Sequence, residues 1–281
     1  MGGRNKKAAR ELRKRQRLLS IASDSSEDSV DNCIYDKKYI RGNPCPKYCK
    51  PKTKNQALFL SSIMSPNSQV VVCHGSAGTG KTLMACQEGI RSLLNNDSDS
   101  IIITRPAVCA DEDIGFLPGD LDDKMKPFTQ PLFDTFEKII PRQHVEHMIH
   151  NNKIQIIPLA YMRGRTFENK FIIADEMQNA SIEQMIMLLT RIGSGSKLIV
   201  VGDPSQCDRK IKQNGLSDLI NRLEKSSNSI TKVKLIKLEN KDVQREDVVK
   251  EILSIVYADR DDNKKSNNSS LTKSNSQQNF L

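Results

Sequence analysis

One eight-residue segment constrains this chain more than any other, because its glycines, lysine and threonine are spaced in a fixed pattern. It consists of Gly75, Ser76, Ala77, Gly78, Thr79, Gly80, Lys81 and Thr82. The apolar run Val70–His74 comes before it, and the helix-favouring sequence TLMACQEGIRSLL begins at Thr82. The pattern G-x-x-x-x-G-K-[ST] in this strand-to-helix context is typical of a phosphate-binding loop.

The residue types of this loop suit a nucleoside triphosphate and its metal ion. Glycines let consecutive backbone N–H groups converge, and the N-terminus of the following helix adds partial positive charge. We expect Lys81 to neutralise charge on the β- and γ-phosphates and the Thr82 hydroxyl to ligate Mg²⁺. The segment therefore predicts a nucleoside triphosphate and Mg²⁺, bound by residues 75–82. The alternative is a glycine-rich turn that binds nothing.

Apolar runs that alternate with helical stretches predict the fold class. Six runs read as strands, and most are rich in Val and Ile with little polar alternation: Val70–His74, Ile101–Arg105, Ile154–Leu159, Phe171–Asp175, Leu198–Asp203 and Val233–Leu238. Such runs fit strands that are buried on both faces of a parallel sheet. The alternation predicts an α/β protein with a doubly wound, mostly parallel sheet.

Two helices can be placed from local signals. One follows Lys81. The other begins after Ser181, which we expect to cap it, with Glu183 in the first turn. Its apolar residues at i, i+3, i+4 and i+7 predict a face made of Ile182, Met185, Ile186 and Leu189.

Two acidic residues end one of the predicted strands. Asp175 closes the run from Phe171, where a carboxylate reaches the Mg²⁺ shell, and Glu176 follows as a candidate general base for the attacking water. An adjacent glutamate favours a hydrolase over a small-molecule kinase, which must exclude water. The alternative is an ordinary strand that ends in acidic turn residues.

A third strand end carries the sequence Gly202-Asp203-Pro204-Ser205-Gln206. We expect Gln206 to sense the γ-phosphate from this position, and the alternative is a plain turn capped by Asp203. The separation of the phosphate loop from Asp175 suits a RecA-like arrangement, in which another strand lies between these two strands in the sheet.

Charge divides the chain into a basic head and a neutral body. The total is +9, and residues 1–55 hold 15 Lys and Arg against 6 Asp and Glu, whereas residues 56–281 hold 28 of each. The head includes Arg10, Arg13 and Lys14, which we consider as nucleic-acid contacts; a solvated arm or a partner tag is the alternative. We expect a flexible basic extension over 1–50, a globular domain with the phosphate loop over 51–258, and a disordered polar tail over 259–281.

Composition excludes several other classes of protein. Aromatic residues make up 5% and Trp is absent, which argues against an aromatic-rich sugar- or base-stacking surface. No apolar run approaches the roughly 20 residues of a membrane helix, and the polar N-terminus lacks the apolar core of a secretory signal. Seven scattered cysteines argue against a disulfide framework and favour a reducing compartment, so we expect a cytoplasmic protein.

Three cysteines in the head raise the question of a zinc site. Cys33, Cys45 and Cys49 give only one well-spaced pair, and no His lies nearby. Free thiols are therefore the preferred interpretation, with zinc as the alternative.

The body, from about Pro51 to Tyr257, resembles the PhoH family of P-loop ATPases, which is related to the core of superfamily 1 helicases. The segments that carry the resemblance are Thr104–Val108, Gly115–Leu121, Lys126-Pro127, Pro131-Leu132, Pro158–Thr166, Asp175–Ala180, Glu183–Met185, Leu189–Gly193 and Gly202-Asp203. Their order and spacing together make it specific. Two departures from the family pattern are Met177 and the pair Pro204-Ser205.

The resemblance implies a RecA-like fold, ATP hydrolysis with Mg²⁺, and a part in RNA unwinding or RNA metabolism. Such proteins are also common in bacteriophage genomes, in which case the host cytoplasm would be the location. By resemblance, Gln56 would read adenine, Arg105 would contact a single strand, and Arg245 would reach the γ-phosphate.

A superfamily 1 helicase binds ATP between two RecA-like domains, and a core of this size has room for one. We therefore expect a homo-oligomeric ring, with a hexamer as the expected size, in which a neighbour's arginine completes each site. Arg163 and Arg165, on either side of Gly164, are candidates beside Arg245.

The leading hypothesis is an Mg²⁺-dependent ATPase acting on single-stranded RNA, with DNA possible. The rival class is an ATP-dependent switch or binding module with negligible turnover. A small-molecule kinase is a third class, and the chain shows no recognisable acceptor-binding lid for it.

Overall fold

The computed structural model describes residues 46–106, 130–207, 214–226, 231–244 and 248, which all lie in a compact unit from Pro44 to Leu281. The basic residues Arg10, Arg13 and Lys14 lie outside the described residues, as do Cys33, Cys45 and Arg245. The same holds for the expected polar tail over 259–281.

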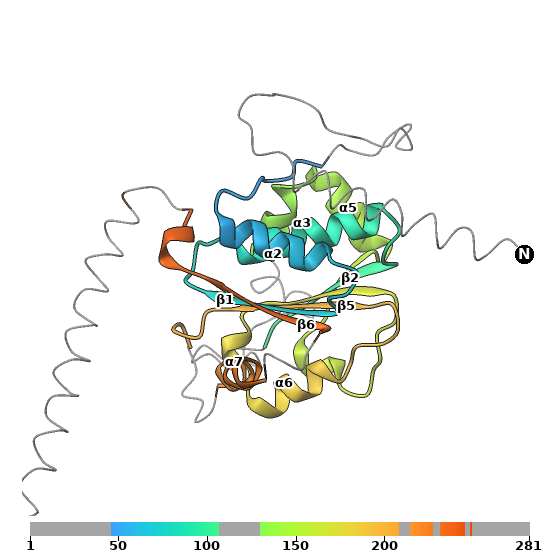
Figure 1. Cartoon of the computed structure of the whole chain (residues 1–281). Helices are drawn as coiled ribbons and strands as arrows, with labels where there is room; N and C mark the ends of the chain where they lie inside the picture. The colour runs from blue at the N-terminus through green and yellow to red at the C-terminus, as the bar shows by residue number, and fades with distance from the viewer. Residues whose placement is uncertain (1–45, 107–129, 208–213, 227–230, 245–247, 249–281) are drawn as a thin grey trace, which may run out of the picture. The chain divides into compact units, whose positions relative to one another are not determined.

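Six parallel strands form one sheet in the order β3-β2-β4-β5-β1-β6 (Figure 1). Their bounds are β1 Val70–Gly75, β2 Ser100–Thr104, β3 Ile154–Ile156, β4 Lys170–Ala174, β5 Lys197–Gly202 and β6 Val233–Leu238. The doubly wound parallel sheet predicted from the sequence is confirmed. The strand between β1 and β4 is β5, which comes later in the chain than both.

Helices cover both faces of this sheet (Figure 1). The α-helices are α2 Lys54–Met64, α3 Lys81–Leu94, α5 Arg142–His150, α6 Ile182–Leu189 and α7 Gly215–Lys225. Three single-turn 3₁₀ helices are η2 Leu159–Met162, η3 Met177–Asn179 and η4 Asn240–Asp242, and residues 130–137 are also helical. The helices α2, α3 and α5 lie over one face, and α6 and α7 over the other.

The core consists of two apolar layers, because successive strand residues point to opposite faces. On β4, Phe171 and Ile173 pack with α2, α3 and α5, whereas Ile172 and Ala174 pack with α6, α7 and η2. Both sets are almost fully buried. This burial of both faces explains why the strands read as near-continuous apolar runs.

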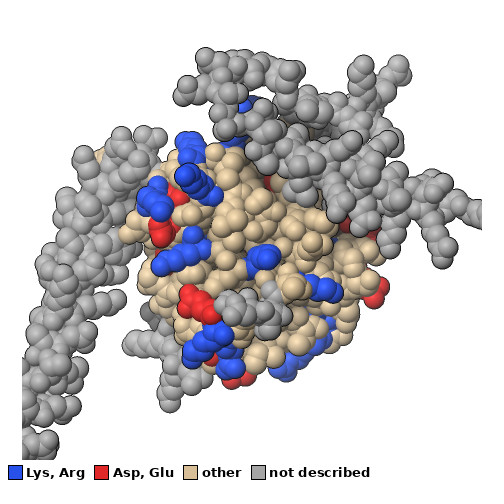
Figure 2. Space-filling model, viewed as in Figure 1, with Lys and Arg blue, Asp and Glu red and all other residues tan. Residues whose placement is uncertain are grey.

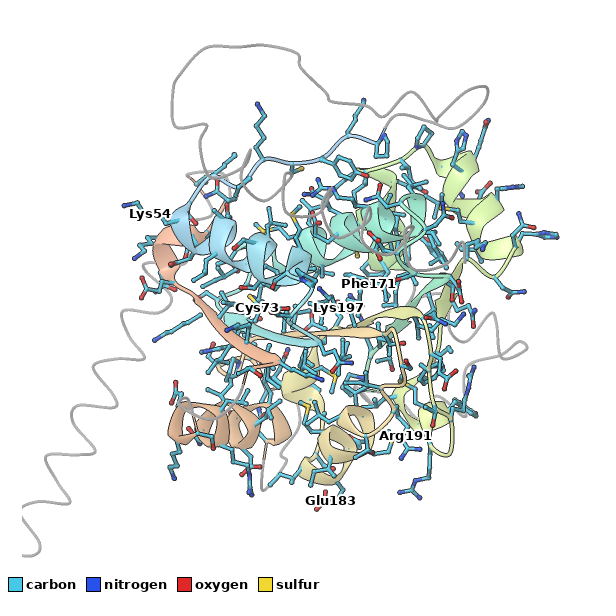
Figure 3. The ribbon with its side chains drawn as sticks, turned by 45° about the vertical axis from the view of Figure 1, so that its right-hand side comes forward. Lys54, Cys73, Phe171, Glu183, Arg191 and Lys197 are labelled. Carbon is cyan, nitrogen blue, oxygen red and sulfur yellow. The ribbon has the colours of Figure 1, made fainter. Side chains whose placement is uncertain are left out.

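Polar contacts anchor peripheral segments to this core. The ammonium of Lys197, at the start of β5, donates hydrogen bonds to the carbonyls of Ile63 and Ser65 at the end of α2 (Figure 3). The Lys47 N–H donates to the Ile139 carbonyl at 2.7 Å, so the segment that leads in from the basic head is held on the α3 and α5 side. Cys49, exposed and outside any disulfide, also lies in this segment.

Two local predictions differ in detail from the structure. The strand expected over 154–159 ends at Ile156, because Pro158 begins η2 and a proline has no N–H to donate to a neighbouring strand. The second helix begins at Ser181 as expected, and Ser181 and Gln184 form a reciprocal capping box. Ile186 is 57% exposed, however, and Leu188 takes the expected place in the core.

Among the residues that the structure describes, no helix is both long and apolar enough to cross a membrane.

Candidate nucleotide-binding site

The phosphate loop, residues 75–82, leads from the carboxyl end of β1 into the N-terminus of α3. Three of its glycines, Gly75, Gly78 and Gly80, have positive φ values of 143°, 81° and 83°. A side chain on Gly75 would also place its Cβ 2.0 Å from the Leu238 carbonyl of β6. Gly80 is the N-cap of α3 and makes no side-chain hydrogen bond to the helix. The first backbone N–H groups of α3 can therefore bind a ligand.

The ammonium of Lys81 lies inside this loop. It donates to the carbonyls of Gly75 at 2.6 Å and Ser76 at 2.8 Å, and its side chain is almost fully buried. Burial lowers the pKa of Lys81 from its usual value because it disfavours the charged form. A phosphate oxygen would offer this ammonium a charged acceptor in place of neutral carbonyls.

The hydroxyl of Thr82 and the carboxylate of Asp175 meet directly. Thr82 Oγ1 donates to Asp175 Oδ1 at 2.9 Å, although the two residues are 93 positions apart in the chain. The contact arises because α3 packs on the face of the sheet to which Phe171 and Ile173 of β4 point, and Asp175 continues this alternation. A hydroxyl and a carboxylate oxygen at the edge of a phosphate loop are ligand types that Mg²⁺ prefers. These residues therefore fit the metal expected from the sequence.

The other oxygen of Asp175 is held by an arginine. Arg105 follows the end of β2 and donates both Nε (3.0 Å) and Nη2 (2.5 Å) to Asp175 Oδ2. The pair is largely buried, since the side chain of Asp175 is 3% exposed and that of Arg105 is 22% exposed. The arginine that sequence similarity suggested for a strand contact thus lies beside the candidate metal ligands, and its role toward a strand stays a prediction.

Glu176 stands next to Asp175 but in a different setting. Its side chain is exposed, and its backbone adopts the left-handed conformation with φ 55°. Gln178 Nε2 donates to Glu176 Oε2 at 2.6 Å. The candidate general base therefore faces solvent while one of its oxygens is already oriented.

Gln56 of α2 contacts the backbone of the phosphate loop. It is 2% exposed, its Oε1 accepts from the Lys52 N–H at 2.7 Å, and its Nε2 donates to the Thr79 carbonyl at 3.1 Å. A further, longer bond joins Nε2 to the Asp242 carbonyl at 3.3 Å. Gln56 thus ties α2 to the loop in this structure, and its reading of adenine stays a prediction.

The segment that precedes Arg245 lies against the same loop. Asn240 in η4 accepts from the Ser76 hydroxyl, and the Gln244 N–H donates to the Gly78 carbonyl at 2.9 Å. Arg245, a candidate γ-phosphate contact, is the next residue and lies outside the described residues. These contacts hold the chain that leads to Arg245 at the phosphate loop.

The remaining described candidates make no hydrogen bond or ion pair with the phosphate loop, Asp175 or Glu176. Gln206 is exposed in the turn after β5, where its N–H donates to the Asp203 carbonyl at 3.0 Å. Arg163 and Arg165 are exposed after η2, and the Arg165 guanidinium stacks on the Phe167 ring at 4.8 Å.

The described surface shows no single basic patch on the face drawn in Figure 2. Lys and Arg side chains lie at several separate places there, with Asp and Glu among them. This face of the described body therefore does not by itself locate a nucleic-acid interface.

Comparison with known proteins assigns the family. Residues 48–257 match the family described as PhoH-like protein. The chain belongs to the PhoH family. PhoH-like relatives occur in Bacillus subtilis, at 39% identity over 76% of this chain and 66% of that protein, and in Synechocystis, at 46% identity over 57% and 48%. Protein PhoH of Escherichia coli is 40% identical over 62% of this chain and 49% of its own length.

This PhoH-family chain spans about half to two thirds of the length of those relatives. Among solved structures, the Pif1 helicase of Candida albicans matches 67% of this chain and 40% of its own, with 17% identity and a TM-score of 0.33. A score this low is no evidence of a shared fold. The fold assignment therefore rests on the sheet topology and the family match.

Proposed function

We propose that this chain is an Mg²⁺-dependent ATPase that acts on single-stranded RNA as an oligomeric, helicase-like remodelling protein. The observation that carries the proposal is the 2.9 Å hydrogen bond between Thr82 Oγ1 of the phosphate loop and Asp175 Oδ1. It brings the predicted metal ligands together beside Glu176, the candidate base. The PhoH family match over 48–257 supports the same class of chemistry.

Each residue of the candidate site would have its own role in ATP hydrolysis. Thr82 and Asp175 would hold Mg²⁺, which when bound neutralises charge on the β- and γ-phosphate oxygens. Lys81 would turn from the loop carbonyls to the phosphates. Glu176 would take a proton from the water that attacks the γ-phosphorus, while the bond from that phosphorus to the β–γ bridging oxygen breaks and ADP leaves.

The nucleic-acid part of the proposal rests on different support. The family resemblance points to RNA, and the basic residues of the head supply the charge that phosphate contacts need. DNA is the alternative strand. The oligomeric part rests on the expectation that one core domain would leave one side of a bound nucleotide uncovered.

The first test is turnover by the wild type and by Glu176→Gln with Mg²⁺. We expect the variant to lose about 100-fold or more in kcat while it binds ATP as tightly as the wild type, since only the base is removed. Glu183→Gln is the matched control, because Glu183 is exposed on α6 and points away from the sheet (Figure 3). Equal turnover by Glu176→Gln and the wild type would refute the assignment of the base.

One observation favours the rival function, a nucleotide-dependent switch. Both acidic residues at the end of β4 already have partners, Arg105 for Asp175 and Gln178 for Glu176. A protein that binds ATP tightly and shows no turnover with any strand would belong to this class.

A further inference from the structure

The side chain of Gln178 joins two strand ends that are far apart in the sequence. Its Nε2 donates to Glu176 Oε2 at 2.6 Å, after β4, and its Oε1 accepts from the Asp203 N–H at 3.1 Å, after β5. Gln178 is 1% exposed and lies in η3. A single buried amide therefore connects the candidate base to the backbone of the neighbouring strand end.

The chemistry of the two partners fixes which way this amide points. A carboxylate only accepts hydrogen bonds, so the NH₂ group must face Glu176. A backbone N–H only donates, so the carbonyl oxygen must face Asp203. A glutamate at this position would satisfy Asp203 but place a second carboxylate against Glu176. Among similarly shaped side chains, glutamine is the one that serves both partners.

The fit around this amide is tight. A Cβ on Gly202 would lie 2.7 Å from Gln178 Oε1 and 3.2 Å from the Gln178 backbone nitrogen. Contacts that short do not occur without movement of one of the groups, so the glycine at the end of β5 lets Gln178 approach. This close packing restricts the amide to the orientation that its partners require.

Glu176 is a residue that needs such a restraint. It is exposed, and its left-handed backbone, at φ 55° and ψ 36°, is a conformation that side-chain-bearing residues adopt at a cost of about 1 kcal/mol. Without a partner, an exposed glutamate samples several rotamers. The hydrogen bond to Gln178 fixes Oε2 and leaves Oε1 available to a water molecule.

The other end of the bridge leads to Gln206. Asp203 Oδ1 accepts from both the N–H and the hydroxyl of Ser205, and the Asp203 carbonyl accepts from the Gln206 N–H at 3.0 Å. A shift of this turn would therefore move the Asp203 N–H and, through the Gln178 amide, the carboxylate of Glu176.

We propose that Gln178 is a positioning residue that holds the Glu176 carboxylate for water activation and couples it to the turn carrying Gln206. The inference rests on the proposed ATPase function. It adds a residue to that site and assigns a path by which the end of β5 sets the orientation of the base.

The kinetic test compares Gln178→Met with Gln87→Met. Methionine keeps the length of glutamine but can neither donate to Glu176 nor accept from Asp203. We expect kcat to fall about 10- to 100-fold, with KM and the Kd for ATP within about 2-fold of wild type. Gln87 is the matched control because it is equally buried in α3 and bonded both ways, to the N–H and carbonyl of Cys49. Gln87→Met should keep kcat.

A second variant separates positioning from folding. Gln178→Glu keeps the shape and the contact with Asp203, but it loses the donor to Glu176. We expect its kcat to fall about 10- to 100-fold, as in Gln178→Met, with the Kd for ATP within about 2-fold of wild type. A residue that served only to fold the protein would leave kcat unchanged in this variant of the same shape.

A third measurement does not depend on turnover. In Gln178→Met the Asp203 N–H loses its acceptor, so its hydrogen exchange by NMR should become about 5- to 10-fold faster, while the Ile199 N–H within β5 stays unchanged. If wild type fails to hydrolyse ATP, the proposed function falls, and this exchange still tests the bridge. Unchanged exchange at Asp203, or wild-type kcat in Gln178→Met, would overturn the inference.

Discussion

At the scale of single residues, Asp175 contacts both the other candidate metal ligand, Thr82, and an arginine, Arg105. One of its oxygens accepts from Thr82 and the other from Arg105, and the carboxylate is buried. A metal cation on the Thr82 side would lie close to the guanidinium, and like charges at such distances repel by several kcal/mol at a partly buried site. Arg105 and a bound Mg²⁺ would therefore compete for the charge of the same carboxylate.

This competition predicts the behaviour of Arg105→Gln. Removing the guanidinium leaves a buried carboxylate without its cation, which should lower the free energy of unfolding by about 2–3 kcal/mol in the metal-free protein. Mg²⁺ with ADP should restore much of that loss, because the metal compensates the same charge. Urea unfolding with and without Mg²⁺ and ADP measures both quantities.

Arg105→Lys is the control for this comparison, since it keeps a positive charge near Asp175. We expect it to be destabilised less than Arg105→Gln and to gain less from Mg²⁺ and ADP. An equal stability loss in Arg105→Gln with and without Mg²⁺ and ADP would show that the ion pair and the metal site are independent.

At the scale of elements, the helix α3 carries a buried acidic residue away from the phosphate loop. Glu88 is 3% exposed and pairs with Arg91 at 2.9 Å. Burial raises the pKa of Glu88 above its ordinary value of 4.5, and Arg91 offsets only part of this effect. The folded protein therefore keeps the Glu88 proton to higher pH than the unfolded chain does.

The sign of the resulting pH dependence follows from proton linkage. Between the ordinary and the raised pKa of Glu88, the folded state binds more protons than the unfolded state, so this group's contribution to stability falls as pH rises. Glu88→Gln should lack that slope and gain stability relative to wild type as pH increases from about 4.5. Urea unfolding across this range is the measurement, and parallel pH profiles for wild type and Glu88→Gln would contradict the assignment.

The elements themselves were largely predictable from the sequence, for a local reason. Strands buried on both faces leave apolar runs such as Phe171–Ala174, and the capping signals around Ser181 are set by nearby residues. The exposure of Ile186 was not predictable, because helical periodicity identifies a broad apolar side and tertiary packing decides which of its residues are covered.

The site was predictable only where its residues follow a fixed local spacing. The positive φ values of Gly78 and Gly80 follow from the loop motif. By contrast, the bonds from Arg105 to Asp175 and from the Asp203 N–H to Gln178 depend on which strands are neighbours. Local periodicity does not determine the order of strands in the sheet, so these contacts could not be predicted from the sequence.

At the scale of the whole molecule, Arg163 and Arg165 lie on the surface after η2. The Arg165 guanidinium stacks on the Phe167 ring of the same chain. Because both arginine side chains are exposed, a neighbouring subunit can reach them. This exposure supports the proposal that these arginines act on a neighbouring subunit's nucleotide.

A ring with arginines acting in trans predicts recovery of activity on mixing. Glu176→Gln subunits lack the base but keep both arginines, whereas Arg163→Ala/Arg165→Ala subunits lack the arginines but keep the base. Each preparation alone should be nearly inactive, and random co-assembly should restore about one quarter of the sites. Mixed assemblies, verified by native mass spectrometry, that show no recovery would contradict the trans role.

The proposed function requires that ATP turnover in this PhoH-family chain is coupled to a nucleic-acid strand. The most direct measurement is steady-state ATP hydrolysis with Mg²⁺, with and without single-stranded RNA or DNA, in the wild type and in a variant lacking residues 1–22. We expect turnover that a single strand stimulates, more strongly for RNA, with weaker stimulation once residues 1–22 are removed. Turnover that is unaffected by either strand, or ATP binding without turnover under every condition, would contradict it.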